Sequence, residues 1–253
     1  MPDDNLNQLA SEGFVLLRSA VEGRAIIAYC DALQATTADR LILVDHDVGV
    51  TAYDPARLRV PLNRLTDTHW PVAAGRELLA ASGLVSALQD GLGTSQILCF
   101  ETFHLEVGLA MRMHRESWFV GLRDRQSLML TAWIALDTIE SGSGELLYVP
   151  GSQLWNGYDE AKIPEAAVVR FGAACMNAER FVARAGDVLI TRGDLGIGGA
   201  PVPAPVPDCR MFVAHFCALR EDPGYFELLE APYRVKRQLT RELYSATVYA
   251  GRY

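Results

Sequence analysis

Hydrophobic residues in the first third of the chain follow two kinds of spacing. They recur every three or four residues over 5–12, 21–39 and 70–92, which predicts helices. The continuous apolar run 14–17 follows the first of these segments and predicts a buried strand. In 41–67, isolated hydrophobic residues stand among Asp and Pro. This pattern predicts a loop with brief strands, and such a loop could border an active site.

From residue 96 onward the apolar stretches become short or alternating, and turn residues separate them. This pattern predicts antiparallel strands of a barrel or sandwich. The predicted strands are 96–106, 108–114, 128–137, 145–149, 180–183, 187–192 and 210–219.

A charged amphipathic segment, 235–243, predicts one more helix near the C-terminus. No linker is long enough to separate two domains, so we expect one domain over residues 1–253. Its parts would be an N-terminal helical support of about residues 1–95, a β core of about 96–220 and a C-terminal helical segment of about 221–253. The predicted fold class is mainly β with flanking helices.

Half of the 253 residues are hydrophobic, so the chain can bury a full core. Its net charge is -8, and Lys and Arg do not cluster as binding to nucleic acid or to an anionic membrane would require. The sequence has no basic and apolar leader and no apolar run of about 20 residues that could span a membrane. We therefore expect a small-molecule substrate, with neither nucleic acid nor a membrane as partner.

Five cysteines are spread along the chain without a Cys-x-x-Cys pair. An odd number with irregular spacing favours reduced, mostly buried thiols over a disulfide framework or a zinc site. We expect a cytoplasmic protein.

The segment His114-Arg115-Glu116 places an imidazole and a carboxylate two residues apart. A strand would turn both side chains to one face, where they could bind a single cation. They would then provide two of the three ligands of a facial metal site. Spacing alone also allows a solvated strand face.

Arginines surround this motif, with acidic residues among them. They could receive an anionic substrate, but the mixed charges favour a solvated face. The residues are Arg112, Arg115, Arg123 and Arg125.

Five sequence blocks, in this order, resemble the phytanoyl-CoA dioxygenase family of Fe(II)- and 2-oxoglutarate-dependent oxygenases. The resemblance implies a double-stranded β-helix, a cupin-like jelly roll with helices on its N-terminal side. The blocks are Glu12-Gly-Phe-Val-Leu-Leu17, Trp133-Ile-Ala-Leu-Asp137, Leu147-Tyr-Val-Pro-Gly-Ser152, Ala185-Gly-Asp-Val-Leu-Ile190 and Arg210 before an apolar strand.

The same resemblance implies roles for individual residues. His114 and Glu116 would hold the iron. Arg210 would bind the distal carboxylate of 2-oxoglutarate through its guanidinium fork. Trp133 would line the cosubstrate pocket, although a plain core position would also explain an aromatic residue there.

The resemblance further implies where the substrate lies. It would sit under the 41–67 loop and the excursion 151–161, which could act as a lid. The residues expected to line its pocket are His69, Trp70, Trp118 and Phe119.

One feature of the family is missing. Relatives carry a second histidine ligand downstream, whereas this sequence has Ile197 there, or Gly196 with a slip of one residue. His215 follows Arg210 where relatives often have a structural histidine and aromatic pair, so we expect a structural role for it.

Three explanations stay open. Asp194 or a water could complete the iron site of an oxygenase that tailors a small organic molecule in secondary metabolism, by hydroxylation or a related oxidation. Alternatively, His114 and Glu116 could act as acid and base in a metal-independent isomerase or cyclase. The chain could also be a non-catalytic partner of an active homologue. A homo-oligomer and a complex with a homologous chain are both compatible with the sequence.

Overall fold

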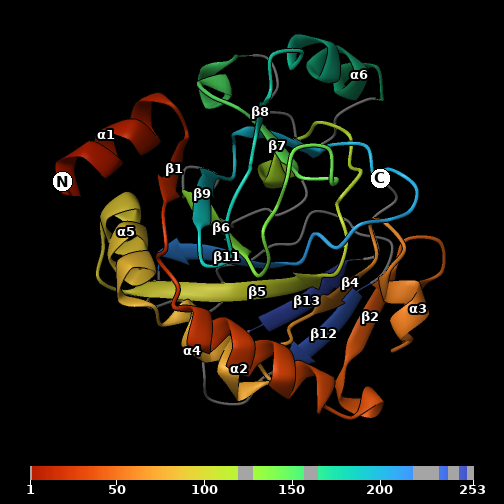
Figure 1. The fold of residues 1–253 in the computed structure, drawn as a ribbon. Coiled ribbons are helices and arrows are strands. Elements are labelled where there is room, and N and C mark those ends of the chain that lie inside the picture. Colours follow the sequence, from red (N-terminus) through yellow and green to blue (C-terminus); the bar gives the residue numbers. More distant parts are fainter. Residues whose placement is uncertain (1, 119–127, 157–164, 219–233, 239–244, 250–253) are drawn as a thin grey trace.

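The computed structural model describes residues 2–118, 128–156, 165–218, 234–238 and 245–249. Its main feature is an eight-stranded sheet, packed against a three-stranded sheet on one face and against helices on the other (Figure 1). The prediction of a mainly β fold with flanking helices is confirmed.

The strands of the large sheet pair antiparallel throughout. In spatial order they are β1 (Phe14–Leu17), β9 (Val188–Arg192), β6 (Met129–Ala135), β11 (Met211–Ala218), β5 (Ile97–Leu105), β4 (Arg64–Thr66), β2 (Ile42–Asp45) and β3 (Gly49–Ala52). The small sheet consists of β10 (Gly196–Gly199), β7 (Leu146–Val149) and β8 (Glu179–Arg180).

Most of the helices belong to the N-terminal part of the chain. Their bounds are α1 (Pro2–Ser11), α2 (Gly23–Gln34), α3 (Pro55–Leu58), α4 (Ala73–Leu79), α5 (Ser82–Leu92) and α6 (Glu165–Ala174), with short 3-10 helices η1 (Ala38–Arg40), η2 (Glu116–Trp118) and η3 (Ser152–Leu154). Helices α2, α4 and α5 cover the outer face of the large sheet (Figure 1). The periodic segment 70–92 is divided into α4 and α5, not one continuous helix.

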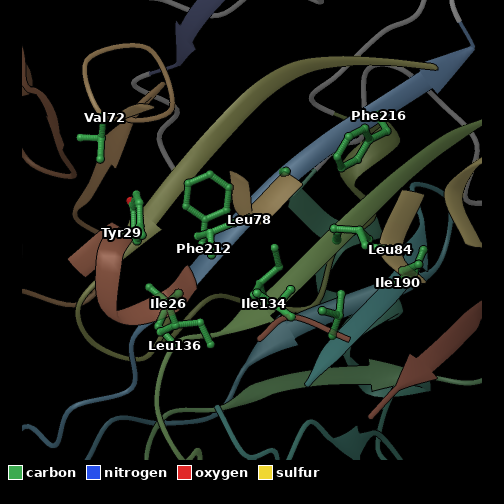
Figure 2. Close-up of a cluster of buried hydrophobic side chains, with 14 of the residues drawn as sticks. Ile26, Tyr29, Val72, Leu78, Leu84, Ile134, Leu136, Ile190, Phe212 and Phe216 are labelled. Atoms are coloured by element: carbon green, nitrogen blue, oxygen red, sulfur yellow. The ribbon is translucent and has the colours of Figure 1, made fainter. Parts of the chain in front are cut away.

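The core on the outer face joins alternate residues of the strands to apolar stripes of the helices. Ile134, Ile190 and Phe212 point from the sheet toward the helices (Figure 2). The ring of Tyr29 meets that of Phe212 edge to face, with centroids 5.1 Å apart. Because strand side chains alternate between faces, the residues next to these three must point to the other side of the sheet.

That other side faces the small sheet and has two different ends. At one end Trp133, Leu189 and Val213 pack against Tyr148 and Ile197 of the small sheet. At the other end the inward-facing positions are polar and buried: Glu101, Thr131, Thr191 and His215. The inner face of the sheet thus changes from apolar to polar along the strands. The rigid sheet holds these polar side chains in fixed positions.

The strands near residue 110 differ from the prediction. Segment 108–114 is not a strand, and only His114 forms an isolated bridge, to Ile197. Ala110 has a left-handed φ of 46°, which interrupts an extended run. Strand β10 was not predicted, because its three glycines do not indicate a strand.

The C-terminal helix predicted over 235–243 is wrong for residues 235–238, which the structure describes as part of a strand. Strands β12 (Arg234–Gln238) and β13 (Ser245–Tyr249) pair antiparallel as a two-stranded sheet. Val, Thr and Tyr residues in these two segments favour strands, and pairing overrides the weak helical period. The N-terminal part is also less purely helical than expected, since β2, β3 and β4 extend the large sheet. The brief strands predicted within 41–67 are confirmed.

Candidate functional site

His114 lies at the polar end of the space between the two sheets. Its backbone N donates to Ile197 O at 2.7 Å, and Ile197 N donates back to His114 O at 2.8 Å. Glu116 then opens η2, and Ser117 N, also in η2, donates to Gly193 O at 2.8 Å. A bridge and a helical turn, not a strand, therefore bring the two side chains together, with His114 Nε2 3.7 Å from Glu116 Oε1.

The imidazole of His114 is held by a backbone acceptor. Its Nδ1 lies 2.8 Å from the carbonyl oxygen of Arg112. A carbonyl only accepts, so Nδ1 must carry the proton. In the neutral ring Nε2 then keeps its lone pair, and it faces Glu116.

A second imidazole reaches the same carboxylate from the large sheet. His215 of β11 is 1% exposed, and its Nε2 lies 3.7 Å from Glu116 Oε2. Its Nδ1 lies 3.0 Å from Glu101 Oε2 on the neighbouring strand β5. The structural role predicted for His215 from the sequence did not include this contact with Glu116. Alternation along β11 could have indicated it, because His215 shares a face with the inward-pointing Val213.

Several buried polar atoms around this group lack a hydrogen-bond partner in the described structure. They are His215 Nε2, Glu101 Oε1 and Thr131 Oγ1. An unsatisfied buried polar atom is costly, and native proteins keep few of them. Three together indicate a place where a ligand completes the bonding.

The charges of the cluster influence one another. Burial raises the pKa of Glu116, but the contacts with His114 and His215 outweigh it, so the pKa lies below its usual value. Burial lowers the pKa of His215, but the hydrogen bond to Glu101 and the charge of Glu116 outweigh it, and the pKa is raised. Burial also raises the pKa of Glu101. The favoured state is therefore an ionised Glu116 with the rings of His114 and His215 on its two sides.

Arg64 of β4 adds a buried positive charge beside the cluster. Its guanidinium lies 4.8 Å from the centre of the Phe103 ring. Its charge acts on Glu101, Glu116 and His215. This arginine was not singled out from the sequence, because an isolated Arg in a short strand has no motif around it.

Arg115, between the two motif residues, points away from them. It is buried and donates to Ser152 O at 2.6 Å and to Trp155 O at 3.0 Å. The solvated face expected for it is wrong, although its neighbour Arg112 is exposed. Arg123 and Arg125 lie outside the described residues. Arg115 therefore fastens the motif to the segment that follows β7.

Arg210 and Trp133, predicted to hold a cosubstrate, lie on opposite faces of the large sheet. Arg210 makes a bidentate ion pair with Asp137, at 2.5 and 2.7 Å. It precedes Met211 and thus lies on the face of β11 opposite to His215, near Cys30 of α2. Trp133 is a buried residue of the inner core, and its Nε1 donates to Thr191 Oγ1 at 3.1 Å. Their cosubstrate roles stay predictions.

The structure also shows the surroundings of Ile197 and Asp194, the two positions considered for a third metal ligand. Ile197 is a buried core residue directly beside His114. Asp194 accepts two hydrogen bonds from Arg192, at 2.9 and 2.8 Å. Among the residues that the structure describes, no three His, Cys, Asp or Glu side chains form a ready-made metal site.

The residues predicted to line a substrate pocket fall into two groups. His69 bonds Thr102 Oγ1 at 2.7 Å and contacts Trp70, and burial with the nearby charge of Arg76 lowers its pKa to about 3. Trp118 packs edge to face on Phe171, at 5.0 Å between ring centres. Phe119 lies outside the described residues, and the pocket stays a prediction.

The sequence of this chain matches one known protein family. The profile of the phytanoyl-CoA dioxygenase (PhyH) family matches residues 9–201, most of the chain. The chain belongs to this family. The comparison with curated proteins gives no match.

Solved structures resemble this PhyH protein in fold at low sequence identity. The epimerase SnoN in complex with Fe3+, alpha ketoglutarate and nogalamycin RO has a TM-score of 0.68 and 16% identity, over 86% of this chain and 83% of that one. The carbocyclase SnoK from nogalamycin biosynthesis has a TM-score of 0.68 and 15% identity, over 85% and 83%. HygX from Streptomyces hygroscopicus, with iron bound, has a TM-score of 0.60 and 14% identity, over 85% and 86%. The fold shared with these proteins is the double-stranded β-helix of the PhyH family.

Proposed function

We propose that this PhyH protein is an Fe(II)- and 2-oxoglutarate-dependent enzyme that tailors a small organic molecule in secondary metabolism. The observation that carries the proposal is the meeting of His114 and Glu116 at the polar end of the inner sheet face. Membership of the family supports it. Related folds that hold iron and 2-oxoglutarate, in enzymes of antibiotic biosynthesis, support it as well.

The donor set suits ferrous iron. Imidazole and carboxylate are the ligands of non-haem Fe(II) sites. The Nδ1 of His114 is fixed by a carbonyl, as in metal-binding histidines, and this leaves Nε2 as the donor. The unsatisfied atoms of Glu101 and His215 place further donors beside the pair. His114 and Glu116 would thus hold the metal.

A carboxylate of 2-oxoglutarate needs a cationic partner near the metal. Arg210 already pairs with Asp137 on the other face of the sheet. Arg64 is buried, and its charge reaches Glu101 and Glu116. We therefore propose Arg64 for this role in place of Arg210, which the family resemblance predicts. Arg64→Met should then weaken 2-oxoglutarate binding more than Arg210→Met does, as measured by titration calorimetry.

Iron with 2-oxoglutarate supplies oxidation of a carbon–hydrogen bond by dioxygen when both are bound. The chain itself orients the reacting groups and shields them from water. Glu101 fixes the ring of His215, and the rings of Phe100 and Phe103 lie 5.8 and 5.5 Å from it. These aromatic walls keep water from the reacting groups.

The proposal is tested on purified protein. Under anaerobic conditions, Fe(II) with 2-oxoglutarate should give the weak visible band of the chelated keto acid, and air should then yield succinate. His114→Ala should abolish both signals. His104→Ala, which removes a buried histidine on the same sheet, should keep them. No iron uptake at millimolar supply would refute the proposal.

A second candidate is a metal-independent isomerase or cyclase on the same fold. The apolar Ile197 beside His114 favours it, because that position gives no ligand. Glu116, with its lowered pKa, would act as the base and His114 as the acid. Such an enzyme would convert its substrate equally well with a chelator and without oxygen, whereas the oxygenase would stop.

The compartment is part of the proposal. None of the helices in the described ranges combines the length and apolar character needed to cross a bilayer. All five cysteines are free thiols. Free thiols suit the reducing cytoplasm, where we place the protein.

A further inference from the structure

We infer that His215 is a metal ligand of this site and takes the place of the downstream histidine that Ile197 replaces. The inference rests on the proposed function. It completes a set of two imidazoles and one carboxylate from two separate parts of the chain. His114 and Glu116 come from the loop that bridges to β10, and His215 comes from β11 of the large sheet.

The orientation of both rings carries the argument. Each imidazole gives its Nδ1 proton to an oxygen: His114 to the carbonyl of Arg112, and His215 to the carboxylate of Glu101. In the neutral form of each ring, the lone pair that can bind a metal is then on Nε2. Both Nε2 atoms then face Glu116, each 3.7 Å from one of its oxygens. A histidine bound through Nδ1 to a carboxylate, with Nε2 free, is a typical metal ligand.

Burial makes a purely structural role for His215 costly. The side chain is 1% exposed, and its Nε2 has no hydrogen-bond partner in the described structure. A core position would be filled better by an apolar residue, as Val213 fills the next inward position of β11. A metal bond to Nε2 would satisfy the orphaned nitrogen.

The three side chains must draw together to share an ion. Ligand atoms about 2.1 Å from one ion lie about 3 Å apart, and both Glu116 contacts are 3.7 Å. Because each imidazole faces a different Glu116 oxygen, the carboxylate also has to rotate. This explains why the described residues show no ready-made triad. Glu116 stands at the start of a short 3-10 helix, where rotation of its side chain does not disturb a strand.

The other ligand candidates are weaker. Both oxygens of Asp194 bond the side chain of Arg192, so ligation would break a bidentate pair. The pKa of Arg192 is raised by that pairing, which shows how strongly the two groups interact. Ile197 has no donor atom. His215 needs no bond to be broken at its Nε2.

The test uses Co(II) as a spectroscopic probe of the full chain. We expect the wild-type protein to bind one Co(II), with visible bands that report its ligand geometry. His215→Gln keeps a donor for Glu101 but removes the imidazole, and it should weaken binding by at least about tenfold and change the bands. His104→Gln is the matched control, since His104 is a buried histidine of β5 that bonds Tyr29 and Glu106, and it should bind like wild type.

A second measurement needs no variant and holds even if His215→Gln does not fold. In the Co(II) protein, proton NMR should show two strongly shifted, exchangeable imidazole N–H signals. They would come from His114 and His215, whose Nδ1 protons are held in internal hydrogen bonds. A single such signal would overturn the inference.

The outcomes separate this inference from the proposed function. Weaker binding in His215→Gln alone, with two shifted N–H signals in wild type, supports the inference. Equal Co(II) binding by wild type and His215→Gln, with unchanged bands, overturns it and leaves the iron proposal standing. No Co(II) or Fe(II) binding by wild type overturns both.

Discussion

At the scale of single residues, the side of a strand that a residue occupies decides its chemistry in this protein. Arg210 and His215 lie five positions apart on or beside β11, and an odd separation places them on opposite faces. Arg210 therefore pairs with Asp137 on the helix side, whereas His215 joins Glu116 between the sheets. One residue more or less between them would place both on the same face of the sheet.

Asp187 shows how one carboxylate can hold two segments together. It accepts hydrogen bonds from Arg18 Nη1, Ser19 N and Arg184 N, at 2.7, 2.8 and 3.0 Å. Burial raises its pKa, but these bonds outweigh it and hold the pKa below its usual value. We expect Asp187→Asn to lower the free energy of unfolding at pH 7 by about 1–3 kcal/mol, measured by urea denaturation.

The same variant should show a defined pH dependence. A carboxylate with a lowered pKa stabilises the fold fully above its unfolded pKa of about 3.9, and this stabilisation is lost as the pH falls through the folded pKa. The difference between wild type and Asp187→Asn should thus stay constant from pH 7 to 5 and shrink below about pH 4. A difference that is the same at pH 7 and pH 3.5 would contradict this account.

At the scale of elements, the turn that leads into β9 requires glycine. Gly186 has a φ of +91°, and a Cβ there would lie 2.3 Å from the carbonyl oxygen of Val21. The turn is tied down on both sides, since Gly186 N donates to Ala135 O and Gly186 O accepts from Val21 N. This close approach joins β6, β9 and the start of the helical layer.

Gly186→Ala should therefore destabilise the fold by more than about 1 kcal/mol in urea unfolding, because the backbone must shift or break these bonds. Gly83→Ala is the matched control. Gly83 lies in α5 with open space around it, and alanine there should raise the stability by up to about 1 kcal/mol. Equal effects of the two substitutions would refute the role of Gly186.

At the scale of the whole molecule, one sheet joins the N-terminal and the β parts. Strand β1 pairs with β9, and β4 pairs with β5, so both ends of the large sheet come from the first 66 residues. The core beneath the helices contains residues from both parts, such as Leu78 and Phe212 (Figure 2). The core on this face is therefore shared by the two parts.

We therefore predict a single cooperative unfolding transition. Tryptophan fluorescence and far-UV circular dichroism should give coincident urea curves, because breaking the shared sheet exposes both parts at once. Two separated transitions would mean that the parts unfold as independent domains and would contradict the prediction of one domain over 1–253.

The sequence by itself determined the elements with strong periodicity and the family. The helical spacing in α2 and α5, the apolar run of β1 and the alternating strands β5, β6, β9 and β11 are local patterns, so they can be read without tertiary contacts. The pair His114 and Glu116 was also predicted from the sequence, because the family resemblance singles out a motif that its spacing alone leaves open.

Only the tertiary structure decided which side chains lie beside that pair. His215 and Arg64 are distant from the motif in sequence, and pairing of β11 and β4 with β5 brings them to it. A left-handed Ala110 and the turn of η2 stand where a strand was expected. The bridge between His114 and Ile197, a contact between distant segments, determines the backbone conformation there. Side-chain periodicity is a local property, whereas a site assembled from separate strands depends on register, which long-range hydrogen bonds and packing set.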